Sequence, residues 1–506
     1  MSGRIGTISY ENRGRVLLLF LLFSLAIYEF ITAGFQTFTI VCLLPLLVLF
    51  VYAAFKWKML TFWTLIIVNY FLQFYLFPLP PVPMSLPNEM LQIILLAIAI
   101  IDTRQNPHFE RVATPMLFAL ALWCGYCTLE VLNDTCNIGI NISAWYSGAR
   151  MMAFQLLYIY LVFVIYISSP KILMRYLKVW AYLSLFSAFW TWKQQNMGLS
   201  SEETAFLYGP GQNTHLLQAG TLIRYWSTFS DAANYGCNAA AASVTFLIIG
   251  ITTKFKIERW FFLIIGILVI WGMFASGTRT AIFCIFAGIA VFIVLSKNVK
   301  IAVPSAIAAV FFFIILAFTN IGQGNQQIRR MRSAFDKKDA STNVRSINQA
   351  TMRKYMKDAP WGIGVGSGYE NVPANNKYRK MATIPPDSEY VYIWLRTGEY
   401  GITIFLISTA IMFIGACWIV FFRLKNPSLI GIGAGLCGAF TAIQLGAYGN
   451  QVLTQFPNGL IFYGGLAIVY TLPHIEPAWI EYEKKRLAIE AEKKRIKLEK
   501  KLASRV

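Results

Sequence analysis

The dominant pattern along the chain is a series of long apolar runs separated by short polar segments. A membrane-spanning helix needs about 20 mostly apolar residues, and fourteen runs approach that length. They lie at roughly 16–35, 38–55, 59–77, 88–103, 115–132, 150–169, 173–192, 233–252, 259–275, 280–296, 300–319, 399–423, 428–447 and 453–471. The pattern predicts an all-α fold, a polytopic transmembrane helix bundle of about 14 spans, within a range of about 12 to 14.

Basic residues in the short polar segments predict the orientation of this bundle. An even number of spans places both termini on one side, and Lys and Arg accumulate in cytoplasmic loops. With the N-terminus inside, the inner loops hold Lys56, Lys58, Arg104, Arg111, Lys171, Arg175, Lys254, Lys256, Arg259, Lys297, Lys300, Arg423 and Lys425. The short outer loops at 36–37, 78–87, 133–149 and 448–452 hold no Lys or Arg. We therefore expect both termini in the cytoplasm.

Two long outer loops and a charged tail depart from this pattern of short connections. The loops at about 193–232 and 320–398 are long enough to carry function, and the second is expected to be partly helical. Residues 1–474 are thus predicted to form one transmembrane domain. Residues 475–506 are predicted to be a basic, cytoplasmic helical tail with Glu and Lys four residues apart. Such a tail is typical of a helix near an anionic leaflet or of a coiled coil with a partner.

Composition supports the membrane class and excludes others. Hydrophobic residues make up 57% of the 506 residues and charged ones only 13%, whereas soluble domains are about a quarter charged. An ordinary soluble enzyme, a disordered chain and a fibrous protein are therefore excluded. The net charge of +20 is attributed to membrane topology, so no nucleic-acid partner is expected. Eight cysteines form no disulfide framework, and no cleavable signal is expected because the first run is long enough to span.

Three arginines on the predicted outer face are candidate anion ligands. Arg224 lies in TLIRYWSTFSDAANYG, Arg279 in the short turn SGTRTAIF, and Arg345 in the second long loop. A single arginine at a membrane surface is often an interfacial anchor, but three that converge from separate loops favour phosphate, which guanidinium groups bind through two parallel hydrogen bonds. A lipid-linked diphosphate is the natural ligand for such an outer site.

Other polar positions in the outer loops have both a structural and a chemical interpretation. WGIGVGSGYENV at 361–372 is either a tight turn or a turn whose backbone N–H groups approach phosphate. Asp387 follows two prolines and precedes a helical pattern, so it is expected to be a helix N-cap and is also a candidate base. His215 is the only histidine predicted outside. No His/Cys cluster has zinc spacing, so neither a metal nor a cofactor is expected.

The order of these motifs resembles the superfamily of bacterial O-antigen ligases and O-antigen polymerases. An arginine precedes STFSDAANYG, SGTRT joins two helices, and a long loop carries APWGIGVGSG and then PDSEYVYIWLRTGEYGITIFL. Gly398 and Gly401 match the glycines at the entry to the next span, and the resemblance covers about 200–425. In ligases this loop typically presents a histidine before that helix, whereas here Asp387 stands at the matching place, which leaves ligase and polymerase both open.

The resemblance implies transfer of a glycan from a polyprenyl-diphosphate carrier to a sugar hydroxyl at the periplasmic face of a bacterial inner membrane. The acceptor is lipid A–core for a ligase, or another lipid-linked glycan for a polymerase. Arg224, Arg279 and Arg345 are then expected to bind the diphosphate, with Asp387 or its rival His215 as the base.

A flippase for polysaccharides or lipid-linked oligosaccharides is the alternative from another class. It would also combine many spans with basic residues, but it needs charges along a central path between two repeated halves. Here the polar residues cluster on one face and no repeat is found, which favours the transferase.

Overall fold

The computed structural model describes residues 10–74, 85–102, 108–209, 216–218, 222–322, 324, 326–332, 340–368 and 371–503. The chain divides into two compact units, Met1–Trp63 and Thr64–Val506. The first unit contains helix α1 (Tyr10–Lys56) and the start of α2 (Lys58–Phe71). Both of the first two predicted spans fall within α1, because the polar residues between them include no proline and do not end a helix.

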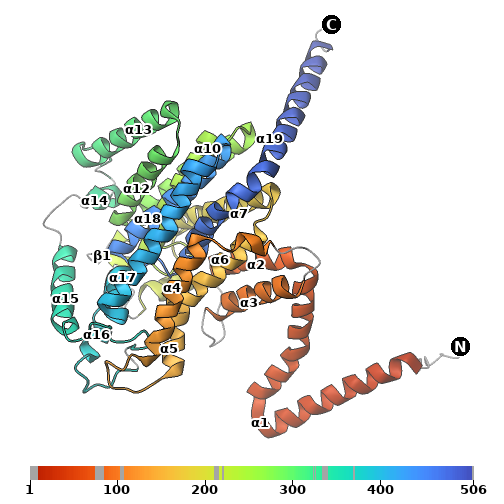
Figure 1. Ribbon diagram of the computed structural model, residues 1–506, viewed down its shortest axis with the longest axis vertical. Helices are drawn as coiled ribbons and strands as arrows, with labels where there is room; N and C mark the ends of the chain where they lie inside the picture. Colours follow the sequence, from red (N-terminus) through yellow and green to blue (C-terminus); the bar gives the residue numbers. More distant parts are fainter. Residues whose placement is uncertain are drawn as a thin grey trace. The chain divides into compact units, whose positions relative to one another are not determined.

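In its described residues, the second unit contains helices and one short hairpin (Figure 1). Its strands, β1 (Leu217–Gln218) and β2 (Leu222–Ile223), pair antiparallel with Leu217 opposite Ile223. Its helices are α3 (Leu86–Ile101), η2 (Phe109–Arg111), α4 (Pro115–Leu129), η3 (Glu130–Leu132), α5 (Ile142–Ala149), η4 (Arg150–Phe154), α6 (Gln155–Tyr166), α7 (Pro170–Asn196), α8 (Ser201–Leu207), α10 (Ala232–Thr252), α11 (Lys256–Ala275), α12 (Arg279–Leu295), α13 (Val299–Phe318), α14 (Gln326–Arg332), α15 (Ala340–Met356), α16 (Arg379–Thr383), α17 (Glu389–Trp418), η6 (Ile419–Arg423), α18 (Pro427–Gly449), η7 (Gly459–Tyr463) and α19 (Gly464–Ala503).

The helices define an all-α, multi-pass membrane protein with fewer clear spans than the sequence predicts. Among the described residues, seven helices are long and apolar enough to cross a membrane, or eight if the bent pair at Val48–Lys56 and Lys58–Phe71 counts as one span. Fourteen spans are not found. Several predicted runs form short helices, such as α2 with 14 residues and α12 with 17, and at 1.5 Å per residue these reach only about 21 to 26 Å. α7 is 27 residues long but carries four lysines and arginines.

The centre of the second unit is a close contact among α10, α12 and α18, which lie side by side in Figure 1. α10 and α18 are rich in Ala and Gly and are almost entirely buried. A Cβ on Gly438 of α18 would lie 2.8 Å from the carbonyl oxygen of Gly288 in α12. Thr245 Oγ1 donates a hydrogen bond to the Gly435 carbonyl across the α10–α18 contact, at 3.1 Å. Small residues therefore let these backbones approach closely, as is common between membrane helices.

Two opposite ends of this helix group can be defined from its contacts. At the loop end, α10, α12 and α17 begin and α18 ends, because Thr278 Oγ1 donates to the Ala232 carbonyl at 2.6 Å and Ser388 Oγ donates to the Ala447 carbonyl at 3.2 Å. At the tail end, Glu483 of α19 lies 2.8 Å from Lys254, directly after α10. The two long loops and the C-terminal tail thus meet opposite ends of the same helices.

The tail continues the last apolar helix without a break and packs on the bundle in its first part. α19 runs from Gly464 to Ala503, Trp479 is fully buried, and Arg486 forms an ion pair with Glu258 of α11 at 2.8 Å. The residues around 475–486 are therefore part of the folded unit rather than a solvated extension.

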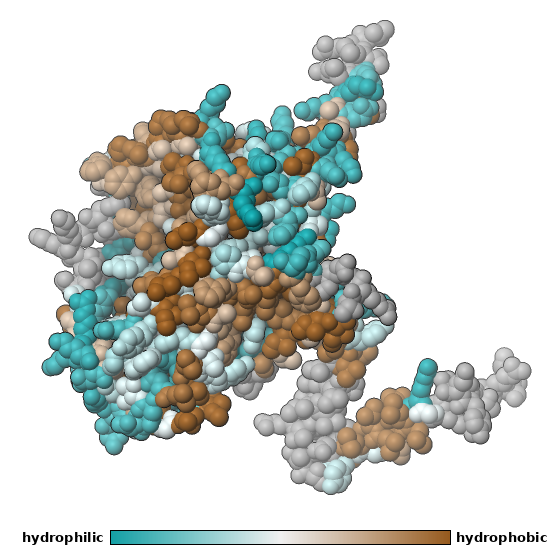
Figure 2. Space-filling model, viewed as in Figure 1, coloured by the Kyte–Doolittle hydropathy of each residue, from teal (hydrophilic) through white to brown (hydrophobic). Residues whose placement is uncertain are grey.

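The segments between α13 and α17 build a small domain over the loop end. A hydrophobic cluster joins α15, the segment 357–378 and the first part of α17 to Cys136 of the loop after η3. Figure 2 shows a hydrophilic surface over α15 and a hydrophobic one over α13, and Leu316 is the only buried residue of α13. α13 thus has the surface of a lipid-facing helix, whereas α15 has the surface of a helix in water.

The predicted orientation is testable with single cysteines at the two ends. Arg329 in α14 and Lys494 in α19 are both exposed. With the loop end outside, a membrane-impermeant maleimide should label an Arg329→Cys variant in intact cells but should label Lys494→Cys only after lysis. The unsubstituted protein controls for its own eight cysteines. Labelling of Lys494→Cys alone in intact cells would reverse the orientation and place the candidate site in the cytoplasm.

Candidate functional site

The loop end gathers the beginnings of α10, α12 and α17 and the ends of α11 and α18 around one turn. This turn, residues 276–278, joins α11 to α12 and places Arg279 at the start of α12. Asn450, just after α18, donates a hydrogen bond to Thr280 Oγ1 at 2.8 Å. The N-terminus of α12, directly after this turn, carries partial positive charge, which favours an anion beside Arg279.

Arg224 lies directly against this turn. Its Nη2 donates to Thr278 Oγ1 at 3.0 Å and its Nε donates to the Ser276 carbonyl at 3.4 Å. Its own backbone is held by the hairpin, because the Arg224 N–H donates to the Leu216 carbonyl at 2.8 Å. Arg279 follows Thr278 in the chain, so the structure brings these two predicted residues to the same turn.

A third arginine on the turn was missed by the sequence reasoning. Arg330 of α14 donates through Nε to the Gly277 carbonyl at 2.8 Å. Gly277 has a positive φ of 58°, and a Cβ there would lie 3.0 Å from Arg330 Cδ. Glycine therefore provides both the turn conformation and the room for the arginine. The available signal was the cluster RRMR at 329–332, which lies close before the predicted Arg345 in the same loop.

The arginines share one electrostatic environment. Burial lowers the pKa of Arg224, Asp231 opposes this shift, and the charges of Arg279 and Arg345 lower it further. Burial and the charges of Arg224 and Arg279 lower the pKa of Arg330 to about 9. Both groups remain protonated at neutral pH. An anion placed among the guanidinium groups would offset their mutual repulsion and raise these pKa values.

Arg345 lines a cavity of about 660 Å³ beside the turn, which we call the α15 cavity. Its walls come from α15, from the start of α12, from the start of α17 and from the end of α18. The lining residues are Thr280, Phe283, Arg345, Ser346, Gln349, Arg353, Ser388, Tyr390, Val391, Leu445, Tyr448 and Gly449. Arg345, Gln349 and Arg353 recur every four residues, so they project from one face of α15. The cavity therefore combines two cations with hydroxyl and amide groups.

Of the two candidate bases, the structure describes only Asp387. His215 lies outside the described residues. Asp387 is half-buried beside Ser388, which lines the α15 cavity. Asp387 is not the N-cap that the sequence predicts, because α17 begins at Glu389 with Ser388 in the capping position. Instead Asp387 has φ of +55°, a left-handed conformation that costs energy in most residues and that is enriched at functional sites.

Glu389 is a buried carboxylate that the sequence reasoning did not select. It is 1% exposed and accepts hydrogen bonds from the Leu453 backbone N–H at 3.2 Å and from Thr454 Oγ1 at 2.9 Å. These bonds tie the start of α17 to the segment 450–458. Its function in the structure is to position that segment under the site.

Buried asparagines hold the same segment against α10. Asn458 donates to Asn234 Oδ1 at 2.6 Å and to the Val452 carbonyl at 2.8 Å, and its own Oδ1 accepts from Asn238 at 2.7 Å. Asp231 caps α10 by accepting from the N–H groups of Ala233 and Asn234. These hydrogen bonds form a continuous polar network at the loop end. The network fixes the backbone near the arginines.

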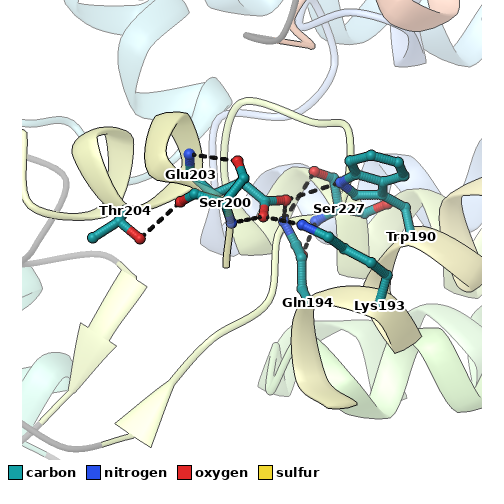
Figure 3. A network of polar contacts seen from close by, with 7 residues as sticks. All are labelled: Trp190, Lys193, Gln194, Ser200, Glu203, Thr204 and Ser227. Atoms are coloured by element: carbon teal, nitrogen blue, oxygen red, sulfur yellow. Dashed lines mark hydrogen bonds and ion pairs between the residues drawn. The ribbon is translucent and has the colours of Figure 1, made fainter. Parts of the chain in front are cut away.

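A second polar network holds the first long loop, and Figure 3 shows its members. Glu203 of α8 is fully buried and accepts from Trp190, Lys193 and Gln194 of α7 at 3.0, 2.5 and 3.0 Å. Gln194 in turn accepts from the backbone N–H of Ser227 at 3.0 Å. Because Ser227 follows Arg224 by three residues, this network connects α7 to the placement of Arg224.

Loss of the Glu203 charge should therefore loosen the segment that carries Arg224. In Glu203→Gln the buried partner of Lys193 loses its charge, so the ion pair between the two side chains is lost. We expect a lower melting temperature and faster proteolysis between residues 208 and 222. Glu202→Gln is the matched control, since Glu202 is its exposed neighbour on α8. Equal stability of the two variants would show that the network does not hold the loop.

In the described part of the glycine-rich segment, residues 361–368 form a tight turn whose first N–H groups bind backbone carbonyls. The N–H groups of Gly362, Ile363 and Gly364 donate to the carbonyls of Ala359, Leu395 and Arg396, respectively. Gly398 is non-helical inside α17, with φ of 68° and ψ of −165°, and a Cβ there would lie 2.0 Å from the Pro360 carbonyl oxygen. The turn thus packs into a kink of α17. The two backbones lie so close there that neither Gly362 nor Gly398 leaves room for a Cβ.

These features define a class of protein, a multi-pass helical membrane protein with a cationic site at one end of its bundle. Among the residues that the structure describes, no group of three His, Cys, Asp or Glu side chains is placed to hold a metal ion. Residues 264–406 match the family model described as O-antigen ligase, which confirms for that segment the resemblance seen in the motifs. The matched region contains Arg279, Arg330, Arg345 and Asp387 but not Arg224. A comparison of the chain with curated proteins found no match.

Proposed function

We propose that the protein is a membrane glycosyltransferase that moves a glycan from a polyprenyl-diphosphate carrier to a sugar hydroxyl. The observation that carries the proposal is the convergence of Arg224, Arg279, Arg330 and Arg345 from four different elements at the loop end. Guanidinium groups bind phosphate oxygens through parallel hydrogen bonds, and a ligand with two adjacent phosphates offers oxygens to several of them at once.

The chemistry of the transfer assigns a role to each part of the site. The acceptor hydroxyl oxygen forms a bond to the anomeric carbon of the donor glycan as the bond from that carbon to the diphosphate oxygen breaks. The electron pair of the broken bond leaves with polyprenyl diphosphate, and the hydroxyl proton passes to a base. Arginines already in place at the diphosphate stabilise its developing charge without further reorganisation. We assign the base to Asp387. This residue lies beside the α15 cavity, and the acceptor hydroxyl would approach it from that cavity.

The proposed setting is the periplasmic face of a bacterial inner membrane, with both termini cytoplasmic. The diphosphate bond is already activated, so the reaction requires no nucleotide on that face. The acceptor is lipid A–core in ligation or a second lipid-linked glycan in polymerisation. Both reactions belong to the synthesis of cell-surface polysaccharide.

The direct experiment supplies the purified protein, in phospholipid nanodiscs, with polyprenyl-diphosphate-linked glycan extracted from the source cells together with their rough lipopolysaccharide. We expect free polyprenyl diphosphate to appear in step with glycan on an acceptor. Passage of intact lipid-linked glycan across proteoliposomes without release of polyprenyl diphosphate would instead identify a flippase.

A further inference from the structure

We propose that a pocket around Trp361 binds the oligosaccharide portion of a substrate, at a distance from the arginines. This Trp361 pocket lies between the end of α4 and the part of α17 that follows the Gly398 kink, and its volume is about 660 Å³. Its lining residues are Tyr126, Leu129, Glu130, Leu132, Asn133, Asp134, Thr135, Trp361, Tyr400 and Ile404. The choice of a glycan as ligand rests on the proposed function, and the pocket itself rests on its own geometry.

Aromatic rings form the wall of the Trp361 pocket. The Trp361 ring lies nearly parallel to Tyr126, with centroids 6.5 Å apart, and its centroid is 4.6 Å from that of Tyr400. Trp361 is 53% exposed and Tyr400 is 52% exposed, so a large ring surface remains open. A sugar ring presents a face of C–H groups that packs on such a surface, while its hydroxyl groups reach polar atoms at the edge.

The Trp361 ring is held in place by its backbone. Asn133 Nδ2 donates to the Trp361 carbonyl at 2.8 Å and to Glu130 Oε2 at 2.9 Å. The Glu399 N–H donates to the Pro360 carbonyl at 2.9 Å. An aromatic residue that only anchors a helix in the membrane interface needs no such fixation, whereas a binding platform gains affinity from it.

A second cavity on the other side of Trp361 indicates a polar, extended ligand. This cavity of about 770 Å³ shares Asp134, Thr135 and Trp361 with the first. Its remaining lining residues are Asn137, Asp358, Pro360, Pro373, Asn375, Asn376, Lys377 and Tyr378. Carboxylates and amides of this kind suit sugar hydroxyls and do not suit a lipid tail.

Charge separates the Trp361 pocket from the arginines. Of the residues described, no arginine lines the two cavities around Trp361, and their one lysine, Lys377, pairs with Asp358 at 3.3 Å. A phosphate is therefore attracted to the loop-end arginines rather than to this place. Glu389 to Thr397 of α17 connect the two places, and nine helical residues span about 12 Å. A glycan whose reacting sugar lies in the α15 cavity would therefore have to extend about this far to reach Trp361.

The test measures binding of free oligosaccharides to the intact protein in nanodiscs by ligand-observed NMR. One probe is the oligosaccharide released by mild acid from the polyprenyl carrier of the source cells, and the other is their delipidated core oligosaccharide. We expect one of them to bind, with Trp361→Ala raising its Kd about tenfold or more and Trp361→Phe recovering most of the affinity. The probe that binds shows whether the pocket serves the donor or the acceptor.

Two further variants keep the result interpretable. Trp418→Ala removes an aromatic of similar exposure from the opposite end of α17 and should leave binding unchanged. Tyr400→Ala should also weaken binding, which guards against a folding defect specific to position 361. The proposal is overturned if neither probe binds the unsubstituted protein, or if Trp361→Ala binds as well as Trp418→Ala does. Oligosaccharide binding without any release of polyprenyl diphosphate would refute the transfer reaction and leave the pocket standing.

Discussion

Replacement of Arg279 by alanine is expected to lower the rate of glycan transfer about a hundredfold or more, with the protein still present in the membrane. This factor is the expected effect of losing one fixed hydrogen-bond donor to the negative charge that develops on the diphosphate. Arg224→Ala and Arg330→Ala should have effects of the same order, because both side chains contact the turn that places Arg279. The measurement is the initial rate of polyprenyl diphosphate release, normalised to protein extracted from the membrane.

A charge-preserving change and a neighbouring arginine serve as controls. Arg279→Lys should recover only part of the rate, since an ammonium group is a point charge and cannot form two parallel bonds to a phosphate. Arg329→Ala removes the exposed neighbour of Arg330 from the same helix and should keep the rate near that of the unsubstituted protein. Alanine variants of Arg224 and Arg279 that both transfer glycan at the normal rate would exclude the arginines as the diphosphate site.

The amino-acid sequence was sufficient to predict the helical class and the position of part of the candidate site. Apolar runs indicate where helices form, and an arginine in a turn of a few residues has little choice of position, so the sequence could place Arg279 between two helices. The described residues show seven or eight candidate spans rather than fourteen, because hydropathy does not show where a helix ends. α12 and α2, for example, are apolar but short. The length of each helix depends on its packing partners in three dimensions.

The missed residues share one property, which is that their partners are distant in sequence. Arg330 contacts Gly277, which lies 53 positions earlier, and Glu389 contacts Thr454, which lies 65 positions later. Their local sequence resembles that of an ordinary loop or helix start. Trp361 likewise becomes informative only when Tyr126 and Tyr400 are seen beside it. The N-cap assignment to Asp387 failed by one residue, because Asp387 takes the left-handed conformation and the helix starts after Ser388.

The left-handed backbone at Asp387 makes a sharp test of the base possible. Asn adopts this conformation as readily as Asp, so Asp387→Asn removes the negative charge without straining the chain. If Asp387 takes the proton of the acceptor hydroxyl, transfer should fall about 10²- to 10⁴-fold while the melting temperature stays unchanged.

Variants of other carboxylates and of His215 distinguish the loss of a catalytic base from a general loss of negative charge. Glu389→Gln disturbs the bonds to the segment 450–458 and should lower the melting temperature, whereas Asp387→Asn should not. Glu202→Gln, at an exposed acidic position on α8 that lines neither the α15 cavity nor the cavities around Trp361, is the control for a general loss of negative charge and should transfer at the normal rate. Normal transfer by Asp387→Asn together with an inactive His215→Ala would move the base to the first long loop. Normal transfer by both variants would mean that the hydroxyl loses its proton without a side-chain base, and that the arginines alone lower the barrier by stabilising the departing diphosphate.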